Sequence, residues 1–164
     1  MVTGSLVVFS MLIYFLFASR IPRTDFWINL TLYTLLFVTY LFFNKQNLNW
    51  KLVLGIGVCF RVIFLCTLPE LSDDFYRFYW DGLQSVNGIS PFAYLPSEIN
   101  NHSLESVFDK LNSQNYYSVY PGVNQLIYSI GVLLSSSLFG FVTVLKTLML
   151  LTEFIVFCFM LSIL

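Results

Sequence analysis

Five stretches of this chain are apolar over lengths that suit a helix crossing a lipid bilayer. A transmembrane helix needs about 20 mostly apolar residues. Continuous apolar runs predict helices, because the strands of a membrane barrel would alternate apolar and polar residues. The sequence therefore predicts an all-α fold, a polytopic membrane helical bundle with about five transmembrane helices. The five runs occupy positions 2–18, 26–43, 52–68, 123–139 and 142–164.

The composition favours the same class and excludes others. Of the 164 residues, 57% are hydrophobic and 10% are charged, whereas about 25% of the residues of a soluble domain are charged. A soluble single domain and a disordered chain are therefore excluded. The chain has 8 Lys and Arg residues against 9 Asp and Glu residues. It thus lacks the basic excess of a protein that binds nucleic acid.

The apolar runs divide the chain into three parts. Residues 1–68 are predicted to form three transmembrane helices, residues 69–121 a large loop, and residues 122–164 two further transmembrane helices. The serines at 135–137 and Gly140 mark the predicted turn region between the last two helices. The last apolar run ends without a charged flank, as in a chain cut inside a helix. We therefore expect further C-terminal helices, or a partner membrane subunit, to complete the bundle.

The basic residues predict an orientation. The short loop 44–51 carries Lys45 and Lys51 and no acidic residue, and such loops face the cytoplasm. The 69–121 loop, one crossing away, is then predicted to lie outside. Arg20 and Arg23 would lie outside as well, which is the opposite of what this rule expects.

The 69–121 loop differs in character from the rest of the chain. It contains seven acidic and two basic residues, so it cannot lie in the hydrocarbon of a bilayer. Loops of this length inside a compact architecture are usually functional. We therefore expect the functional residues of the chain to lie mainly in this loop.

Residues 72–83 show the pattern of an amphipathic helix. Ser72 can cap the helix by accepting an unpaired amide hydrogen. Asp73 and Asp74 then lie in the first turn, where the helix dipole favours negative charge. We predict an interfacial helix whose apolar face enters the headgroup boundary and whose carboxylates face water or protein. The two faces comprise Phe75, Phe78, Tyr79 and Leu83 on one side, and Asp74, Arg77, Asp81 and Gln84 on the other.

Three sequence blocks in this part of the chain resemble a known family. They read LSDDFYRFYWDG at 71–82, NGISPFAYLP at 87–96 and NYYSVYPGVNQLIY at 115–128. In this order they resemble the first exterior loop of GT-C superfamily glycosyltransferases, in particular the bacterial polyprenyl-phosphate-mannose-dependent mannosyltransferase-like proteins. The resemblance implies a many-span enzyme of the bacterial inner (plasma) membrane. Its partners would be a polyprenyl-phosphate-linked sugar donor and membrane lipids.

The same resemblance implies that Asp73 and Asp74 supply the catalytic carboxylate. One would take the proton of the acceptor hydroxyl as general base, and the other would orient it or bind a metal ion. A divalent cation at this pair is thus the one candidate cofactor. The alternative, from the residues alone, is that both carboxylates only complement the helix dipole, with Arg77 as their ion-pair partner.

Charged side chains supply three candidate substrate contacts. Arg61 lies in the third apolar run, about eight residues or 12 Å from its outer end. An arginine at that depth must pair or serve a polar cavity. It would contact the donor phosphate or an active-site acid, or else form a structural pair with Glu153 or with a missing helix. Arg77 and Asp81, on the polar face of the amphipathic helix, are the other two candidates.

Three further candidates lie around the start of the fourth apolar run. Tyr120 precedes Pro121, a residue that suits the first turn of a helix. Its ring would stack on a sugar or a polyprenyl chain, or anchor the chain at the membrane interface. Asn124 and Gln125 would hydrogen-bond a substrate hydroxyl, or satisfy backbone groups.

The sequence therefore favours a membrane glycosyltransferase that moves a sugar, mannose by the resemblance, from a polyprenyl phosphate to an acceptor hydroxyl on the exterior face. One alternative is a non-enzymatic membrane subunit or an inactive N-terminal fragment of such an enzyme. A less favoured alternative is a transporter with Arg61, Lys146 and Glu153 as pathway charges. Transporter sites tend to lie at the bilayer midplane, whereas the polar residues here gather in one loop.

Overall fold

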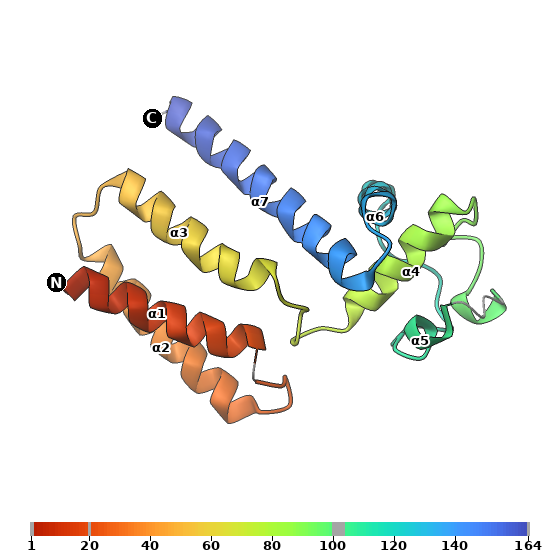
Figure 1. Cartoon of the computed structure of the whole chain (residues 1–164), viewed down its shortest axis with the longest axis horizontal. Helices are drawn as coiled ribbons and strands as arrows, with labels where there is room; N and C mark the ends of the chain where they lie inside the picture. The colour runs from red at the N-terminus through yellow and green to blue at the C-terminus, as the bar shows by residue number, and fades with distance from the viewer. Residues whose placement is uncertain (1, 20, 100–103, 164) are drawn as a thin grey trace. The chain divides into compact units, whose positions relative to one another are not determined.

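The computed structural model describes residues 2–19, 21–99 and 104–163, and within them every regular element is a helix (Figure 1). The predicted all-α fold is therefore confirmed, while Arg20 lies outside the described residues. The chain forms two compact units, Met1–Leu71 and Ser72–Leu164. The elements are α1 (Val2–Ser19), α2 (Phe26–Asn44), α3 (Trp50–Leu65), α4 (Asp74–Val86), a 3-10 turn (Pro96–Glu98), α5 (Glu105–Phe108), α6 (Gly122–Leu134) and α7 (Leu138–Ile163).

In the first unit, α1 packs against both α2 and α3. Ring contacts join them: Tyr14 lies 4.9 Å from Phe60 of α3, and Phe17 lies 4.8 Å from Tyr33 of α2. Aromatic pairs at these centroid distances add to the energy of burial. Most other large apolar side chains of this unit are exposed.

Two helices are long and apolar enough to cross a membrane. They are α2, with 19 residues, and α7, with 26. At about 1.5 Å per residue, α7 is about 39 Å long, which exceeds the bilayer core of about 30 Å. Among the described residues α1 has a shorter apolar stretch, Thr3–Ala18, and α3 has 16 residues. Five membrane-spanning helices were expected, and only two of the described helices are long and apolar enough.

The turn between the last two helices lies at the predicted serines, but α6 is shorter than the predicted run 123–139. It ends at Leu134 and Ser135 is extended, whereas Gly140, which was also predicted to mark the turn, lies within α7. The Ser135 hydroxyl accepts a hydrogen bond from the Ser137 amide, and the Ser137 hydroxyl accepts one from Gly140. Serine side chains that bond nearby backbone groups compete with the helix ladder. With 13 residues, α6 is about 20 Å long.

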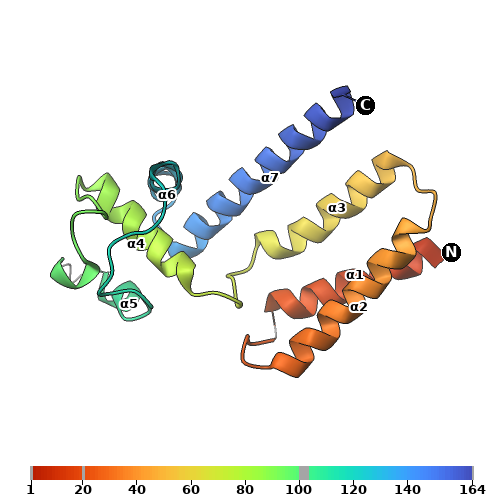
Figure 2. The same cartoon turned by 180° about the vertical axis from the view of Figure 1, so that it is seen from behind.

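In the second unit, α4 packs chiefly on α6 and also contacts α5 and α7. Figure 2 shows this unit from behind, with α4 running past the end-on α6. Phe75 and Tyr79 are each 6% exposed, and the Tyr79 ring lies 5.1 Å from that of Phe141 in α7. These two residues of the predicted apolar face are therefore covered by protein rather than left for the headgroup boundary.

The polar face of α4 is buried as well. Arg77, Asp81 and Gln84 are all at most 2% exposed. The carboxylates of this helix were expected to face water or protein, and the Asp81 carboxylate is enclosed by protein. The amphipathic pattern arises because this helix meets protein on both faces, one contact being aromatic and the other polar.

Close approach of α4 to α6 depends on Gly82. A Cβ atom there would lie 2.7 Å from the Tyr128 carbonyl oxygen and 2.9 Å from Val132 Cγ2. We expect Gly82→Ala to lower the free energy of unfolding by about 1–3 kcal/mol, because overpacking against backbone is not easily relieved. Thermal unfolding in detergent would measure this. The control is Gly122→Ala, since a Cβ at Gly122 meets nothing within 4 Å; equal melting temperatures for the two variants would contradict the prediction.

Candidate functional site

The candidate catalytic carboxylates lie at the start of α4. Asp73 is the residue before the helix and Asp74 is its first residue. The Asp74 amide donates to the Ser72 hydroxyl at 3.2 Å, so Ser72 satisfies a helix-start amide as predicted. Both carboxylates thus lie near the positive end of the helix dipole.

Asp74 contacts Asn112 and acts electrostatically on Tyr120, two residues that are distant from it in sequence. Its Oδ1 accepts a hydrogen bond of 3.0 Å from the Asn112 side-chain amide. Burial raises the pKa of the Tyr120 hydroxyl, and the negative charges of Asp74 and Asp81 raise that pKa further, while the positive charge of Arg77 lowers it. Tyr120 therefore stays neutral at pH 7, and its hydroxyl can donate a hydrogen bond near the carboxylate.

Tyr120 belongs to an aromatic cluster between α4 and α6. Its ring meets Phe78 edge-on at 4.8 Å, and Phe78 stacks on Tyr128 at 4.7 Å. Asn124 shares a side-chain hydrogen bond with Tyr128, so it supports this cluster instead of a backbone group. Phe78 and Tyr120 are half-buried, which leaves part of each ring for another molecule.

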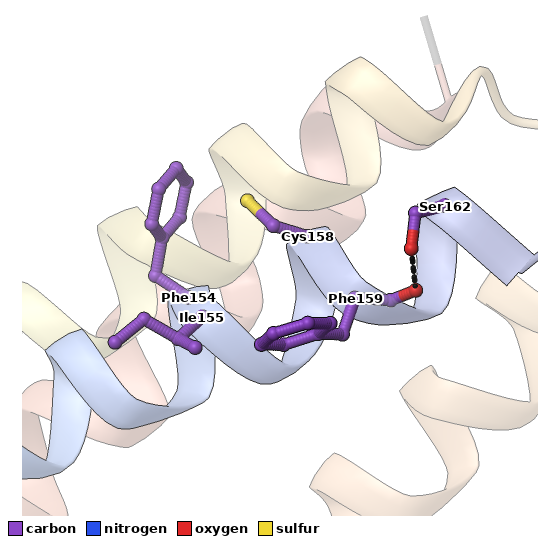
Figure 3. A pocket seen from close by; sticks show the side chains of 5 residues that line it. All are labelled: Phe154, Ile155, Cys158, Phe159 and Ser162. Carbon is purple, nitrogen blue, oxygen red and sulfur yellow. Dashed lines mark hydrogen bonds between the residues drawn. The ribbon is translucent and has the colours of Figure 1, made fainter.

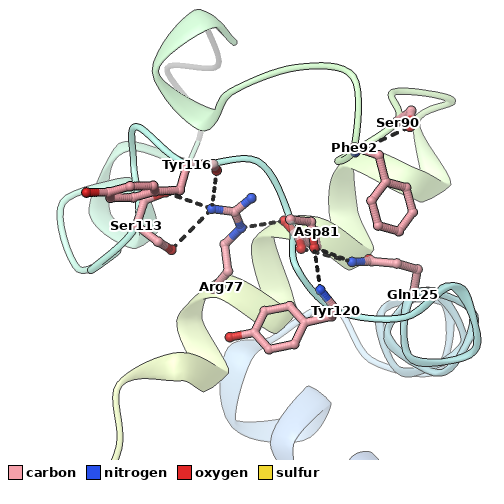
Figure 4. A network of polar contacts seen from close by, with 9 residues as sticks. Arg77, Asp81, Ser90, Phe92, Ser113, Tyr116, Tyr120 and Gln125 are labelled. Atoms are coloured by element: carbon pink, nitrogen blue, oxygen red, sulfur yellow. Dashed lines mark hydrogen bonds and ion pairs between the residues drawn. The ribbon is translucent and has the colours of Figure 1, made fainter.

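A buried polar network occupies the other face of α4 (Figure 4). Arg77 Nε donates to Asp81 Oδ1 at 2.7 Å. Gln125 of α6 donates to Asp81 Oδ2 at 3.0 Å and to the Ser118 hydroxyl at 2.7 Å. Asp81 is 0% exposed, and both of its oxygens accept hydrogen bonds. The proposed substrate contacts Arg77, Asp81 and Gln125 are thus bonded to one another inside the unit.

Arg77 also holds the loop that follows α5. Its Nη1 donates to the carbonyl oxygens of Ser113, at 2.7 Å, and Tyr116, at 2.9 Å. In Figure 4 the Tyr116 carbonyl faces the guanidinium while its ring points away. The Ser118 amide donates a hydrogen bond of 3.0 Å to the Pro91 carbonyl oxygen, which connects the loop after α4 to this network. The network therefore joins all three sequence blocks, at 71–82, 87–96 and 115–128.

Arg61 lies in the first unit, on α3. It is exposed, and its Nη1 donates to the Gly57 carbonyl oxygen one turn earlier at 3.3 Å. Arg61 and the residues of α4 belong to different units, and each unit is described separately. The predicted contact of Arg61 with the donor phosphate therefore stays a prediction.

No group of three or more His, Cys, Asp or Glu side chains that could hold a metal ion occurs among the described residues. Asp73 and Asp74 offer two carboxylates, and Asp74 Oδ1 already binds Asn112. Mg²⁺ commonly binds proteins through one or two carboxylates together with substrate phosphates. The pair therefore fits a cation only when a phosphate oxygen of the donor completes the coordination.

An apolar hollow of about 300 Å³ lies along α7 (Figure 3). Its one polar side-chain group is the Ser162 hydroxyl, which already donates to the Phe159 carbonyl oxygen at 2.7 Å. The hollow can therefore accept an apolar group. It is lined by Phe154, Ile155, Cys158, Phe159 and Ser162.

Comparison of the chain with family models, with curated proteins and with solved structures finds no match. The interpretation of the site thus depends on its geometry and on the resemblance of the three blocks. Sequence reasoning missed Asn112, Ser113 and Ser118. Nothing in the polar stretch around them distinguishes them from their neighbours, because their partners lie 36 to 38 positions away or in another loop.

Proposed function

We propose that this chain is a membrane glycosyltransferase that moves a sugar, mannose, from a polyprenyl-phosphate donor to an acceptor hydroxyl. The observation that carries the proposal is Asp74. Its carboxylate stands at the start of α4, held by Asn112, and its negative charge acts on the hydroxyl of Tyr120, whose ring is half-buried. A carboxylate within electrostatic reach of a partly open aromatic ring suits a sugar hydroxyl next to a sugar face. The network that joins the three family-like blocks also supports the proposal.

In the proposed reaction, the oxygen of the acceptor hydroxyl attacks the anomeric carbon of the donor sugar. The bond between that carbon and the phosphate oxygen breaks, and the phosphate leaves with the electron pair. Asp74 takes the hydroxyl proton, a contribution of about 10²–10⁴-fold for a well-placed general base. Direct displacement inverts the anomeric centre. Asp73 would orient Asp74, or share a cation with the donor phosphate.

The proposed enzyme lies in a bacterial plasma membrane. Its helices α1, α3 and α6 lie in the membrane together with the longer α2 and α7, and the 69–121 segment lies outside. The exposed apolar side chains along α7, such as Phe154 and Phe159, support contact with lipid or with further membrane helices. Oligomeric or C-terminal partner helices would cover part of that surface.

A second candidate is a non-enzymatic membrane subunit. The observation that favours it is the burial of Arg77, Asp81 and Gln125, which bond one another. On this view the polar residues stabilise the unit and bind no substrate. The deciding experiment incubates membranes containing the chain with labelled polyprenyl-phosphate mannose. Transfer of the label to a new product supports the enzyme, whereas no transfer supports the subunit, and sugar counterflow in liposomes without transfer supports a transporter.

We expect EDTA to leave the rate of transfer within about twofold of the untreated rate. Asp74 Oδ1 already accepts a hydrogen bond from Asn112, and the second oxygen of Asp74 takes the proton in the proposed reaction, so we favour the orienting role of Asp73 over a shared cation. The measurement is label transfer in membranes with and without EDTA. Loss of transfer that added Mg²⁺ restores would contradict this expectation and would place a cation between the carboxylates and the donor phosphate.

A further inference from the structure

Asn112 contacts Asp74, the proposed general base. Its side-chain Nδ2 donates to Asp74 Oδ1 at 3.0 Å, across 38 positions of sequence. No residue that the structure describes hydrogen-bonds the second carboxylate oxygen of Asp74. We propose that Asn112 is a positioning residue, which fixes the plane of the carboxylate so that Oδ2 faces the acceptor hydroxyl. This inference rests on the proposed function.

The backbone next to Asn112 is anchored. Arg77 lies one turn after Asp74 on α4, and its Nη1 donates to the carbonyl oxygen and hydroxyl of Ser113 at 2.7 and 3.1 Å. Arg77 itself is held by Asp81 and is 2% exposed. The exposed Asn112 side chain thus starts from a fixed backbone, so less conformational freedom is lost when it binds Asp74. A reacting group held by such a supporting contact keeps its productive geometry.

An amide suits this position chemically. Its N–H groups donate to an ionised carboxylate in a charge-assisted hydrogen bond. Being neutral, it leaves the negative charge of Asp74 uncompensated, so the carboxylate can still accept a proton. A lysine or arginine at the same place would stabilise the charged form by an ion pair and make a weaker base.

The test compares Asn112→Asp with Asn115→Asp in membranes containing the full chain. Both change an exposed asparagine of one loop to aspartate, but only position 112 donates to Asp74. We expect Asn112→Asp to lower the maximal rate about ten- to a hundredfold, with the KM for labelled polyprenyl-phosphate mannose changed less than about twofold. Asn112→Gln, which keeps the amide donor, should recover part of the rate.

Two further results decide the matter. In an Asp74→Asn background, Asn112→Asp should cause no additional loss, because both residues act through one carboxylate. Equal rates for Asn112→Asp and Asn115→Asp would overturn the inference, as would a loss that appears mainly in KM or that Asn112→Gln does not relieve. If Asp74→Asn is inactive in those cases, the proposed function still stands. Full activity of Asp74→Asn overturns the proposed function as well.

Discussion

Asp74→Asn should lower sugar transfer about 10²–10⁴-fold while the protein still folds and inserts into membranes. The loss is that of a general base, because an amide cannot take up the hydroxyl proton. The fold should persist, since the oxygen of the introduced amide can still accept the hydrogen bond from Asn112 that Oδ1 accepts now. The measurement is the rate of label transfer from polyprenyl-phosphate mannose, normalised to the amount of inserted protein.

Two matched variants sharpen this result. Asp109→Asn removes the same charge from an exposed residue of the same segment and should transfer at the wild-type rate. Asp73→Asn should lose less than Asp74→Asn, because the carboxylate of Asp74 accepts the hydrogen bond from Asn112 and raises the pKa of Tyr120. A wild-type rate for Asp74→Asn would show that this carboxylate is not the base. If Asp73→Asn alone were inactive, the two roles would be reversed.

Asp81→Asn should lower the stability of the second unit by about 3–5 kcal/mol, the cost of breaking a buried ion pair. Both Asp81 oxygens accept from donors, Arg77 Nε at 2.7 Å and Gln125 Nε2 at 3.0 Å. An asparagine has one acceptor oxygen and one donor nitrogen, so one of these donors would face another donor. Arg77 would also keep its buried charge without a counterion.

Thermal unfolding in detergent, followed by loss of the monodisperse protein peak, would measure this difference. Asp109→Asn is again the control, because it makes the same change at an exposed site. We expect that variant to unfold within about 0.5 kcal/mol of the wild type. Equal stability of the Asp81 and Asp109 variants would mean that the network does not hold α4 to α6.

The contacts that one helix makes with itself could be predicted from the sequence. Asp73 and Asp74 fall at the start of α4 as predicted, and Arg77 and Asp81 share a face because residues three or four apart do so on any helix. The alternative that paired Arg77 with Asp73 and Asp74 has the wrong partner, since Arg77 pairs with Asp81. The all-helical fold followed from the continuous apolar runs, because barrel strands would alternate apolar and polar residues. The serines at 135–137 indicated the turn after α6, but not that this helix ends as early as Leu134.

Contacts between residues far apart in the sequence could not be predicted in this way. Asn112 reaches Asp74 over 38 positions, and Gln125 reaches Asp81 over 44. No periodicity links such residues, because the path of the loop between them sets their distance. Burial of both faces of α4 was hidden for the same reason: an amphipathic pattern shows that the two faces differ, and not what covers each.

By itself, the sequence determined that this chain is helical and apolar, and that its carboxylates gather in one segment. Composition and helical spacing are local properties, and they survive in any arrangement of the helices. The tertiary structure alone decided that Asp81 is enclosed while Asp74 keeps an oxygen without a hydrogen bond from the described residues. That distinction depends on where α6 and the 112–118 loop pack against α4, and packing is a property of the folded unit.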